Sequence, residues 1–264
     1  MKNKKNIVIV EIILSIVMTT LIIGVVIYEV RLLTKKELYK NLQSMKTDNM
    51  TIIINTDDDK NKPGEISIDD PAPDFIEMKK LNPDIFAYIC INGTKVEYPI
   101  VNRRGDNNFY LNHNIDGSYG LPGCVYTEDI NGNSLNSPIT IIYGHNMRDK
   151  SMFGALHSYM DADYFSKNNI ITIYEQDNNN SVKYEYEIIA AGSIGDEYIP
   201  TSYDINDVNS IKAIAKKMST YKNYIENASA IENIGNKDKA VILSTCNSGN
   251  NRVRYLVVGL LKYE

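Results

Sequence analysis

The chain has 264 residues, of which 43% are apolar and 23% are charged, so it can form one sizeable domain with additional segments. Its formal net charge of -5 and the lack of a dense basic stretch give no reason to expect nucleic acid as a partner. The three cysteines, Cys90, Cys124 and Cys246, lie far apart and are odd in number, which argues against a disulfide framework and against a zinc site.

The N-terminal segment differs from the rest of the chain. Three lysines, at positions 2, 4 and 5, precede an apolar run over 7–28 that is interrupted only by Glu11. This run is long enough to cross a bilayer as a helix. It is also long for a cleaved signal peptide, and no A-x-A-like cleavage site follows it. We therefore expect residues 1–30 to form an uncleaved anchor that contacts the plasma membrane through residues 7–28. Basic residues flank the run on both sides, so charge alone does not set its orientation.

The next segment, 31–74, is expected to be a stalk or linker. Residues 31–45 can continue as a short polar helix. Residues 46–74 are rich in Asp, Asn and Pro, which is typical of a flexible connection. Apolar patterning typical of a globular domain begins at Phe75, so we expect the folded domain to span 75–264.

Turn residues divide this domain into short apolar runs. A short helix is expected first, capped by Asp74 and closed by Pro83. Asn92-Gly93 then separates two runs, which is the strongest short signal for a β-hairpin. In total the pattern predicts eight strands, at 85–91, 94–101, 123–128, 139–143, 170–175, 182–191, 240–245 and 253–261.

One amphipathic helix interrupts the predicted strands. Apolar residues between Val208 and Ile225 recur at a spacing of three to four, and we expect this helix between the sixth and seventh strands. Its lysines are expected to form a solvated face. Many strands with few helices predict a mostly β fold, namely a closed or nearly closed barrel.

A possible nucleophile lies at the end of the seventh predicted strand. A free thiol has a pKa near ~8.5, so Cys246 would need a nearby cation or base to become a thiolate. Arg252 and Arg254 begin the next strand, and residues two apart face the same way, so alternation does not choose between them. Either arginine could stabilise a developing oxyanion. A buried cysteine beside an unrelated arginine is the alternative.

The chain has three histidines that could act as the base. His145 directly follows a predicted strand at a turn marked by glycine, where a strand delivers a side chain to a barrel rim. His113 lies in a predicted loop and His157 in a predicted short helix, and we expect both to be structural.

Several of these segments together resemble the class B sortases. "LSTC" (243–246) followed by "RYLVVG" (254–259) resembles the cysteine and arginine strands of sortases. "TIIYGHNMRDKSMFG" and, upstream, "DNNFYLNHNIDG" are similar to the histidine region of class B, and "NPDIFAYICINGTKVEYPIV" is similar to its opening hairpin. The resemblance covers residues 75–264. It implies an eight-stranded sortase-type β-barrel with a short N-terminal helix and an extra helix between strands 6 and 7, preceded by one transmembrane helix.

The resemblance also implies roles for individual residues. Cys246 would be the nucleophile, His145 the acid and base, and Arg254 the catalytic arginine. No metal or cofactor is implied. The segment 247–253 is short, so the groove rim there is expected to differ from the family. Substrate-binding positions would be Asn107, Leu111, Tyr143 and Ser244, with Tyr198 and Ile199 in the groove wall.

The implied function is that of a membrane-anchored cysteine transpeptidase of Gram-positive bacteria. Such an enzyme cuts the C-terminal sorting signal of surface proteins after threonine, holds a thioester, and transfers the acyl group to a peptidoglycan-precursor amine (lipid II or a stem-peptide amine). The N-terminus would be cytoplasmic and the catalytic domain extracellular.

Three alternatives remain open from the sequence. A cell-wall cysteine peptidase or amidase would use the same Cys/His pair with water as the acceptor. A pilin-polymerising sortase would often carry a second, C-terminal anchor, whereas this sequence stops at Glu264, soon after the last predicted strand. A membrane-anchored binding domain would have no catalytic cysteine.

Overall fold

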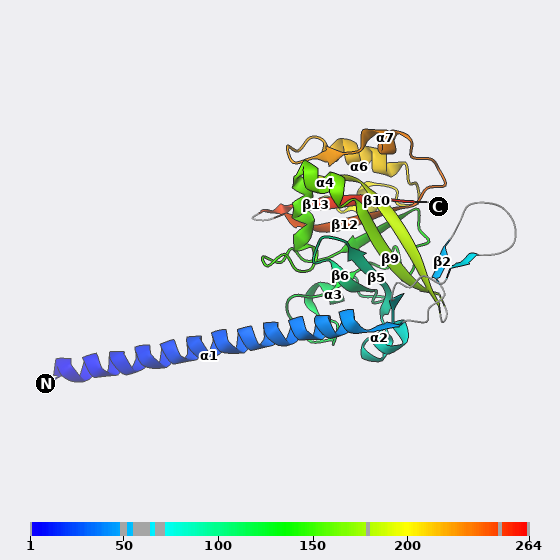
Figure 1. The fold of residues 1–264 in the computed structure, drawn as a ribbon. Coiled ribbons are helices and arrows are strands. Elements are labelled where there is room, and N and C mark those ends of the chain that lie inside the picture. The colour runs from blue at the N-terminus through cyan, green and yellow to red at the C-terminus, as the bar shows by residue number, and fades with distance from the viewer. Residues whose placement is uncertain are drawn as a thin grey trace. The chain divides into compact units, whose positions relative to one another are not determined.

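A computed structural model describes residues 2–47, 52–54, 64–66, 72–177, 180–247 and 250–262 (Figure 1). The chain divides into two compact units, Met1–Asn41 and Leu42–Glu264. Much of the expected stalk over 31–74, and part of the segment 247–253, lie outside the described residues. The domain boundaries at 30 and 74 stay predictions.

The first unit is helical. Helix α1 (Lys2–Ser44) contains the apolar run, and residues 31–44 continue it. By length and composition, its segment from Ile9 onward could cross a membrane, and the most apolar part of that segment is not buried against the protein. Among the described residues, no other helix meets these criteria.

The second unit is built around a closed barrel of eight strands, as the sequence predicts. β10 pairs antiparallel with β13 and closes the barrel. Neighbouring strands are antiparallel except for two parallel pairs, β12 with β8 and β6 with β7. The order around the barrel is β13 (Asn250–Leu261), β12 (Ala240–Asn247), β8 (Ile139–Tyr143), β7 (Val125–Tyr126), β6 (Glu97–Val101), β5 (Ile85–Ile91), β9 (Ile170–Asp177) and β10 (Asn180–Ile194).

The hairpin predicted at Asn92-Gly93 is confirmed. β5 and β6 pair antiparallel across it, and Gly93 has a φ of +77°, a conformation that glycine adopts without strain. β6 begins at Glu97 rather than at the predicted Thr94. The reason is that the Thr94 hydroxyl serves the turn, where it donates to the Ile91 carbonyl at 2.8 Å.

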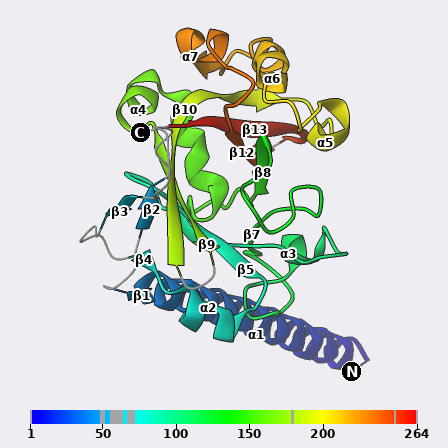
Figure 2. The same ribbon diagram turned by 90° about the vertical axis from the view of Figure 1, so that its right-hand side faces the viewer.

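Short helices and strands lie around the barrel. In α2 (Phe75–Leu81) the Asp74 carboxylate accepts from the Glu77 backbone N–H at 3.0 Å, which confirms the predicted cap. Figure 2 shows α2 on the opposite side of the barrel from α6 and α7. The remaining elements are β1 (Lys46–Thr47) paired with β4 (Ala72–Pro73), β2 (Ile52–Ile54) paired with β3 (Gly64–Ile66) and β10, α3 (Phe109–Asn112), the 3-10 helix η1 (Phe153–Met160), α4 (Ala162–Lys167) and α5 (Ile199–Ser202).

The predicted helix between the sixth and seventh barrel strands is present but shorter than 208–225. α6 (Ser210–Met218) ends early, and β11 (Ile225–Glu226) and α7 (Ala228–Glu232) follow. A tertiary contact accounts for the difference, because the Asn223 amide donates to the Ser193 hydroxyl of β10 at 2.8 Å. Ile225 then pairs with β10 as a strand residue.

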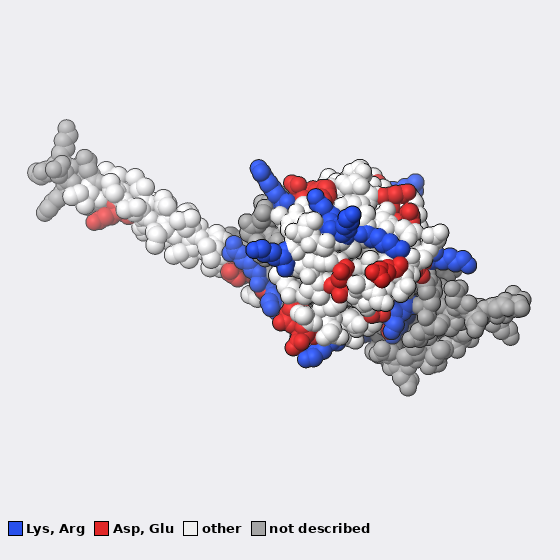
Figure 3. Space-filling view, turned by 90° about the horizontal axis from the view of Figure 1, so that it is seen from above, with Lys and Arg blue, Asp and Glu red and all other residues white. Residues whose placement is uncertain are grey.

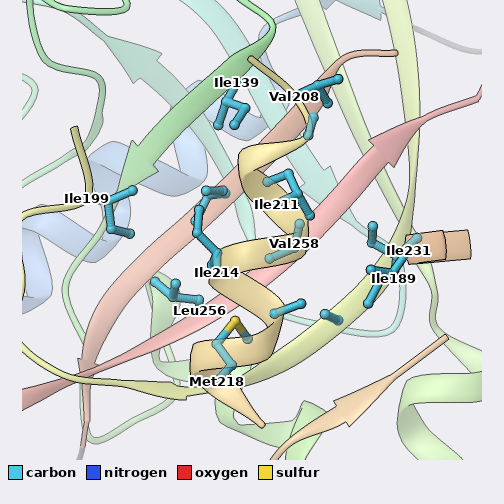
Figure 4. Packing of buried hydrophobic residues seen from close by; sticks show 14 of the residues in the cluster. Ile139, Ile189, Ile199, Val208, Ile211, Ile214, Met218, Ile231, Leu256 and Val258 are labelled. Carbon is cyan, nitrogen blue, oxygen red and sulfur yellow. The ribbon is translucent and has the colours of Figure 1, made fainter. Parts of the chain in front are cut away.

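The apolar face of α6 packs against the barrel strands. Ile211, Ile214 and Met218 are buried against Leu256 and Val258 of β13 (Figure 4). Full burial of such side chains contributes about 1.5–3 kcal/mol each. The molecular face that carries α6 and α7 shows basic and acidic side chains interspersed (Figure 3).

Candidate functional site

Cys246 lies at the end of β12, opposite Arg254 of β13. The two residues are register partners, and Arg254 Nη1 donates to Cys246 Sγ at 3.3 Å. The register then shifts, because the next pair is Asn247 with Asn250. Arg252 is exposed. The structure thus brings Arg254 to the thiol, a choice that strand alternation left open.

His145 reaches the same edge of the barrel because β8 and β12 run parallel, so their carboxyl ends meet. Tyr143 and Ser244 are register partners at these ends. Three hydrogen bonds join the segments beyond them: Gly144 N to Ser244 O at 3.1 Å, Thr245 Oγ1 to Gly144 O at 2.7 Å, and Asn146 Nδ2 to Cys246 O at 3.0 Å. They hold the backbone of His145 beside that of Cys246.

The imidazole of His145 is oriented by a backbone carbonyl. His145 Nε2 lies 2.6 Å from the oxygen of Leu111. A carbonyl oxygen can only accept, so we assign the proton of this contact to Nε2. Nδ1 is then the nitrogen left for other partners.

Cys246, His145 and Arg254 line one cleft of about 340 Å³. The ring of Tyr126 stacks on that of Tyr143 in this cleft, with the centroids 5.5 Å apart. The other lining residues are Asn108, Leu111, Glu128, Gly144, Asp196, Glu197, Tyr198, Ile199, Ser244 and Thr245. The cleft therefore offers a thiol, an imidazole and a guanidinium together, which suits acyl transfer.

Five of the six predicted substrate-binding residues line this cleft: Leu111, Tyr143, Tyr198, Ile199 and Ser244. Asn107 does not. Its side-chain oxygen instead accepts from the Asp129 backbone N–H at 2.8 Å, and its neighbour Asn108 lines the cleft.

The other two histidines lie outside the lining of this cleft. His113 stacks on Phe109 with the ring centroids 4.0 Å apart, and its Nδ1 lies 2.8 Å from the Phe109 carbonyl. His157 stacks on Tyr255. In the part of the chain that the structure describes, there is no group of three or more His, Cys, Asp or Glu side chains that could hold a metal ion.

Sequence reasoning missed Glu128, which is the most buried carboxylate of the cleft. Its Oε2 accepts from the Tyr143 hydroxyl at 3.4 Å and, in a short hydrogen bond, from the Tyr198 hydroxyl. Burial raises the pKa of Glu128, against the lowering effect of these two hydrogen bonds. Burial also raises the pKa of Tyr198, to about 12, with Glu128 adding to the effect. The available signal was the position of Glu128 at the end of the predicted strand 123–128, which resembles the position of His145 just after the strand 139–143.

Comparison with known proteins gives relatives of one kind. No protein-family model matches the chain. Sortase B of Listeria monocytogenes is 31% identical over 175 residues, which cover 65% of this chain and 66% of the relative, so the match spans slightly less than two thirds of that protein. Sortase B of Staphylococcus aureus is 26% identical over 193 residues, which cover 72% of this chain and 74% of the relative.

Solved structures agree with these sequence matches. A Staphylococcus aureus sortase B–substrate complex is 27% identical, has a TM-score of 0.57, and aligns over 72% of this chain and 84% of the other. Sortase B from B. anthracis is 20% identical, with a TM-score of 0.64 over 87% of this chain and 96% of the other. At that identity the second match bears on the fold alone, and it supports the barrel.

Proposed function

The chain belongs to the class B sortase family of cysteine transpeptidases, and from this premise we propose that it cleaves a C-terminal sorting signal after threonine and transfers the acyl group to an amine. The observation that carries the proposal is the contact between Arg254 Nη1 and Cys246 Sγ at 3.3 Å, in a cleft that His145 also lines. A guanidinium that already contacts the sulfur is placed to donate to the oxyanion that forms when this sulfur attacks a carbonyl.

In the first half-reaction the Cys246 sulfur attacks the threonine carbonyl and forms a tetrahedral intermediate. Arg254 donates to the developing oxyanion, a contact whose loss typically costs about 3 kcal/mol, or roughly a hundredfold or more in rate. The carbon–nitrogen bond then breaks, and a thioester to Cys246 remains.

His145 moves the protons in both half-reactions. As imidazolium it protonates the leaving amine, and as imidazole it takes a proton from the incoming amine that attacks the thioester. The contact of Nε2 with the Leu111 carbonyl supports Nδ1 as the nitrogen that transfers these protons.

The proposed function includes the membrane location of the chain and the molecules that donate and accept the acyl group. The apolar helix α1 supports a single-pass anchor through residues 7–28. Membership of the sortase family is the reason to propose a cytoplasmic N-terminus and an extracellular catalytic domain over 75–264. The acyl donor is a surface protein with a C-terminal sorting signal. The acceptor is the amine of a peptidoglycan precursor, lipid II or a stem peptide.

The test is cleavage of a library of sorting-signal peptides, scored by mass spectrometry. Cys246→Ala should abolish cleavage, and activity that survives this change would exclude Cys246 as the nucleophile. Arg254→Ala should lose about a hundredfold in rate, whereas the exposed Arg252→Ala is the matched control and should keep nearly all of it. Equal losses would contradict the role of Arg254.

The same assay separates transpeptidation from hydrolysis. With an added amine, a transpeptidase yields the amide product at the expense of the free acid. A product that stays the free acid at every amine concentration would instead identify a peptidase that uses water.

A further inference from the structure

Glu128 lies in the reaction cleft but has no part in the chemistry proposed above. The residue is only 9% exposed, and it lines the cleft beyond the end of β7. The hydroxyls of Tyr143, from β8, and Tyr198, from the segment before α5, converge on the same oxygen, Oε2. Two donors from separate elements fix the orientation of this carboxylate.

The second oxygen of Glu128 is left for a ligand. Among the described residues, no donor makes a hydrogen bond to Oε1. Oε1 does not belong to the buried side-chain atoms without a partner, so it stays accessible to a molecule that enters the cleft. Burial raises the pKa of Glu128, as expected for a charge that the protein compensates only in part.

The cleft is lined by charged residues of both signs. Arg254 and His145 lie with Cys246, whereas Asp196 and Glu197 immediately precede Tyr198, which binds Glu128. Within the described ranges, no lysine, arginine or histidine lies at ion-pair distance from any of these three carboxylates. The side of the cleft near Tyr198 therefore complements a cation rather than an anion.

We propose that Oε1 of Glu128 accepts a hydrogen bond from a positively charged side chain, lysine or arginine, of the sorting peptide, and that Glu128 thereby determines substrate specificity. This inference rests on the proposed function. The two tyrosine hydroxyls act as positioning groups that hold the carboxylate ready, so little conformational entropy is lost when the peptide binds.

The test uses the full chain in detergent and pairs of peptides that carry lysine or its uncharged isostere norleucine at one position before the threonine. For the wild type, we expect kcat/KM for lysine to exceed that for norleucine about tenfold or more at one position. In Glu128→Gln, which keeps the size of the side chain, this ratio should fall to about one while norleucine peptides are still cleaved.

Asp129→Asn is the matched control. The carboxylate of Asp129 does not line the Cys246 cleft and accepts a hydrogen bond from the Gly105 N–H. Asp129→Asn removes one negative charge, as Glu128→Gln does. It should keep the wild-type preference for lysine. The inference is overturned if Glu128→Gln keeps that preference, if no position prefers lysine, or if Glu128→Gln changes only the KM for the acceptor amine.

A binding measurement separates this inference from the proposed function. Fluorescence anisotropy of the same labelled peptides on the Cys246→Ala chain needs no turnover. Lysine-dependent binding that requires Glu128, without cleavage by the wild type, would support the site and contradict the transpeptidase. Cleavage that requires Cys246 but shows no dependence on Glu128 would do the reverse.

Discussion

The three cysteines of the chain differ in their electrostatic surroundings. Cys246 receives a hydrogen bond from a guanidinium at the end of its strand. Burial, with the nearby carboxylate of Glu97, raises the pKa of Cys90 to about 11, and Cys124 is buried. The raised pKa of Cys90 and the burial of Cys124 disfavour reaction at these two thiols, whereas Cys246 lines an open cleft, so we expect a clear order of reactivity.

We expect a thiol reagent at pH 7.5 to modify Cys246 first and to leave Cys90 as a thiol, because pH 7.5 lies well below the raised pKa of Cys90. Peptide mapping by mass spectrometry measures the site and its rate. Faster modification of Cys90 than of Cys246 would contradict this order.

Gly123 is a second residue on which the geometry of the site depends. Its φ is +68°, and an added Cβ would lie 3.0 Å from His145 Cδ2 and 3.0 Å from the Tyr110 carbonyl oxygen. Gly123→Ala should cost about 1–3 kcal/mol in stability. It should also lower peptide cleavage by on the order of tenfold or more, because the imidazole must move.

Gly117→Ala separates these two effects. Gly117 has a similar φ of +76°, but nothing lies within 4 Å of an added Cβ. Chemical denaturation should show a loss of stability in both variants, whereas the loss of activity should be confined to Gly123→Ala. Similar losses of activity in the two variants would show that backbone strain, rather than contact with His145, is responsible.

At the scale of elements, the parallel pair β8–β12 brings the site together. The hydroxyl of Thr245 spans this pair and donates to the Gly144 carbonyl at 2.7 Å, directly before His145 and Cys246. Thr245→Val removes the donor from the partly buried carbonyl of Gly144. We expect a loss of about 1–2 kcal/mol in the free energy of unfolding, together with a lower kcat.

Thr220→Val is the control for this prediction. Thr220 also donates to a backbone carbonyl, that of Lys217 at 2.8 Å, but it is exposed and lies outside the lining of the cleft. Its replacement should change stability by a few tenths of a kcal/mol and leave peptide cleavage unchanged. If Thr245→Val behaves in the same way, the hydroxyl does not hold the two strand ends together.

The helices and strands of this fold differ in how well sequence patterns predict them. Strands and the Asn92-Gly93 hairpin were predictable because their signals are local, in alternation and turn chemistry. The end of α6 was not, because it depends on a hydrogen bond between Asn223 and Ser193, thirty positions apart. Local propensity carries no information about such a contact.

The residues of the candidate site also differ in how far the sequence predicts them. Cys246 and His145 could be singled out as reactive side chains at strand ends. Glu128 also ends a predicted strand, but that signal does not show that the hydroxyls of two tyrosines from distant segments orient its carboxylate. For Asn107 the sequence marked the correct loop, but the backbone turns Asn108 rather than Asn107 into the cleft.

For the whole molecule, the start of the folded β-barrel domain is the boundary to test. The sequence predicts it at 75, yet the second compact unit begins at Leu42, which is fully buried. Gln43 Nε2 donates to the Glu97 carbonyl at 2.9 Å, and Lys46 pairs with the Glu97 carboxylate at 3.2 Å. A domain that begins at 75 would lack all of these contacts.

We therefore expect a chain of residues 42–264 to be more stable to denaturant than one of residues 75–264, by about 2–4 kcal/mol. Most of this difference comes from burial of Leu42, so Leu42→Ala in the longer chain should reproduce a large part of it. Lys46→Ala should change little, because its ion pair is exposed. Equal stability of the two chains would place the start of the folding unit at 75, since the contacts of residues 42–46 would then contribute nothing to it.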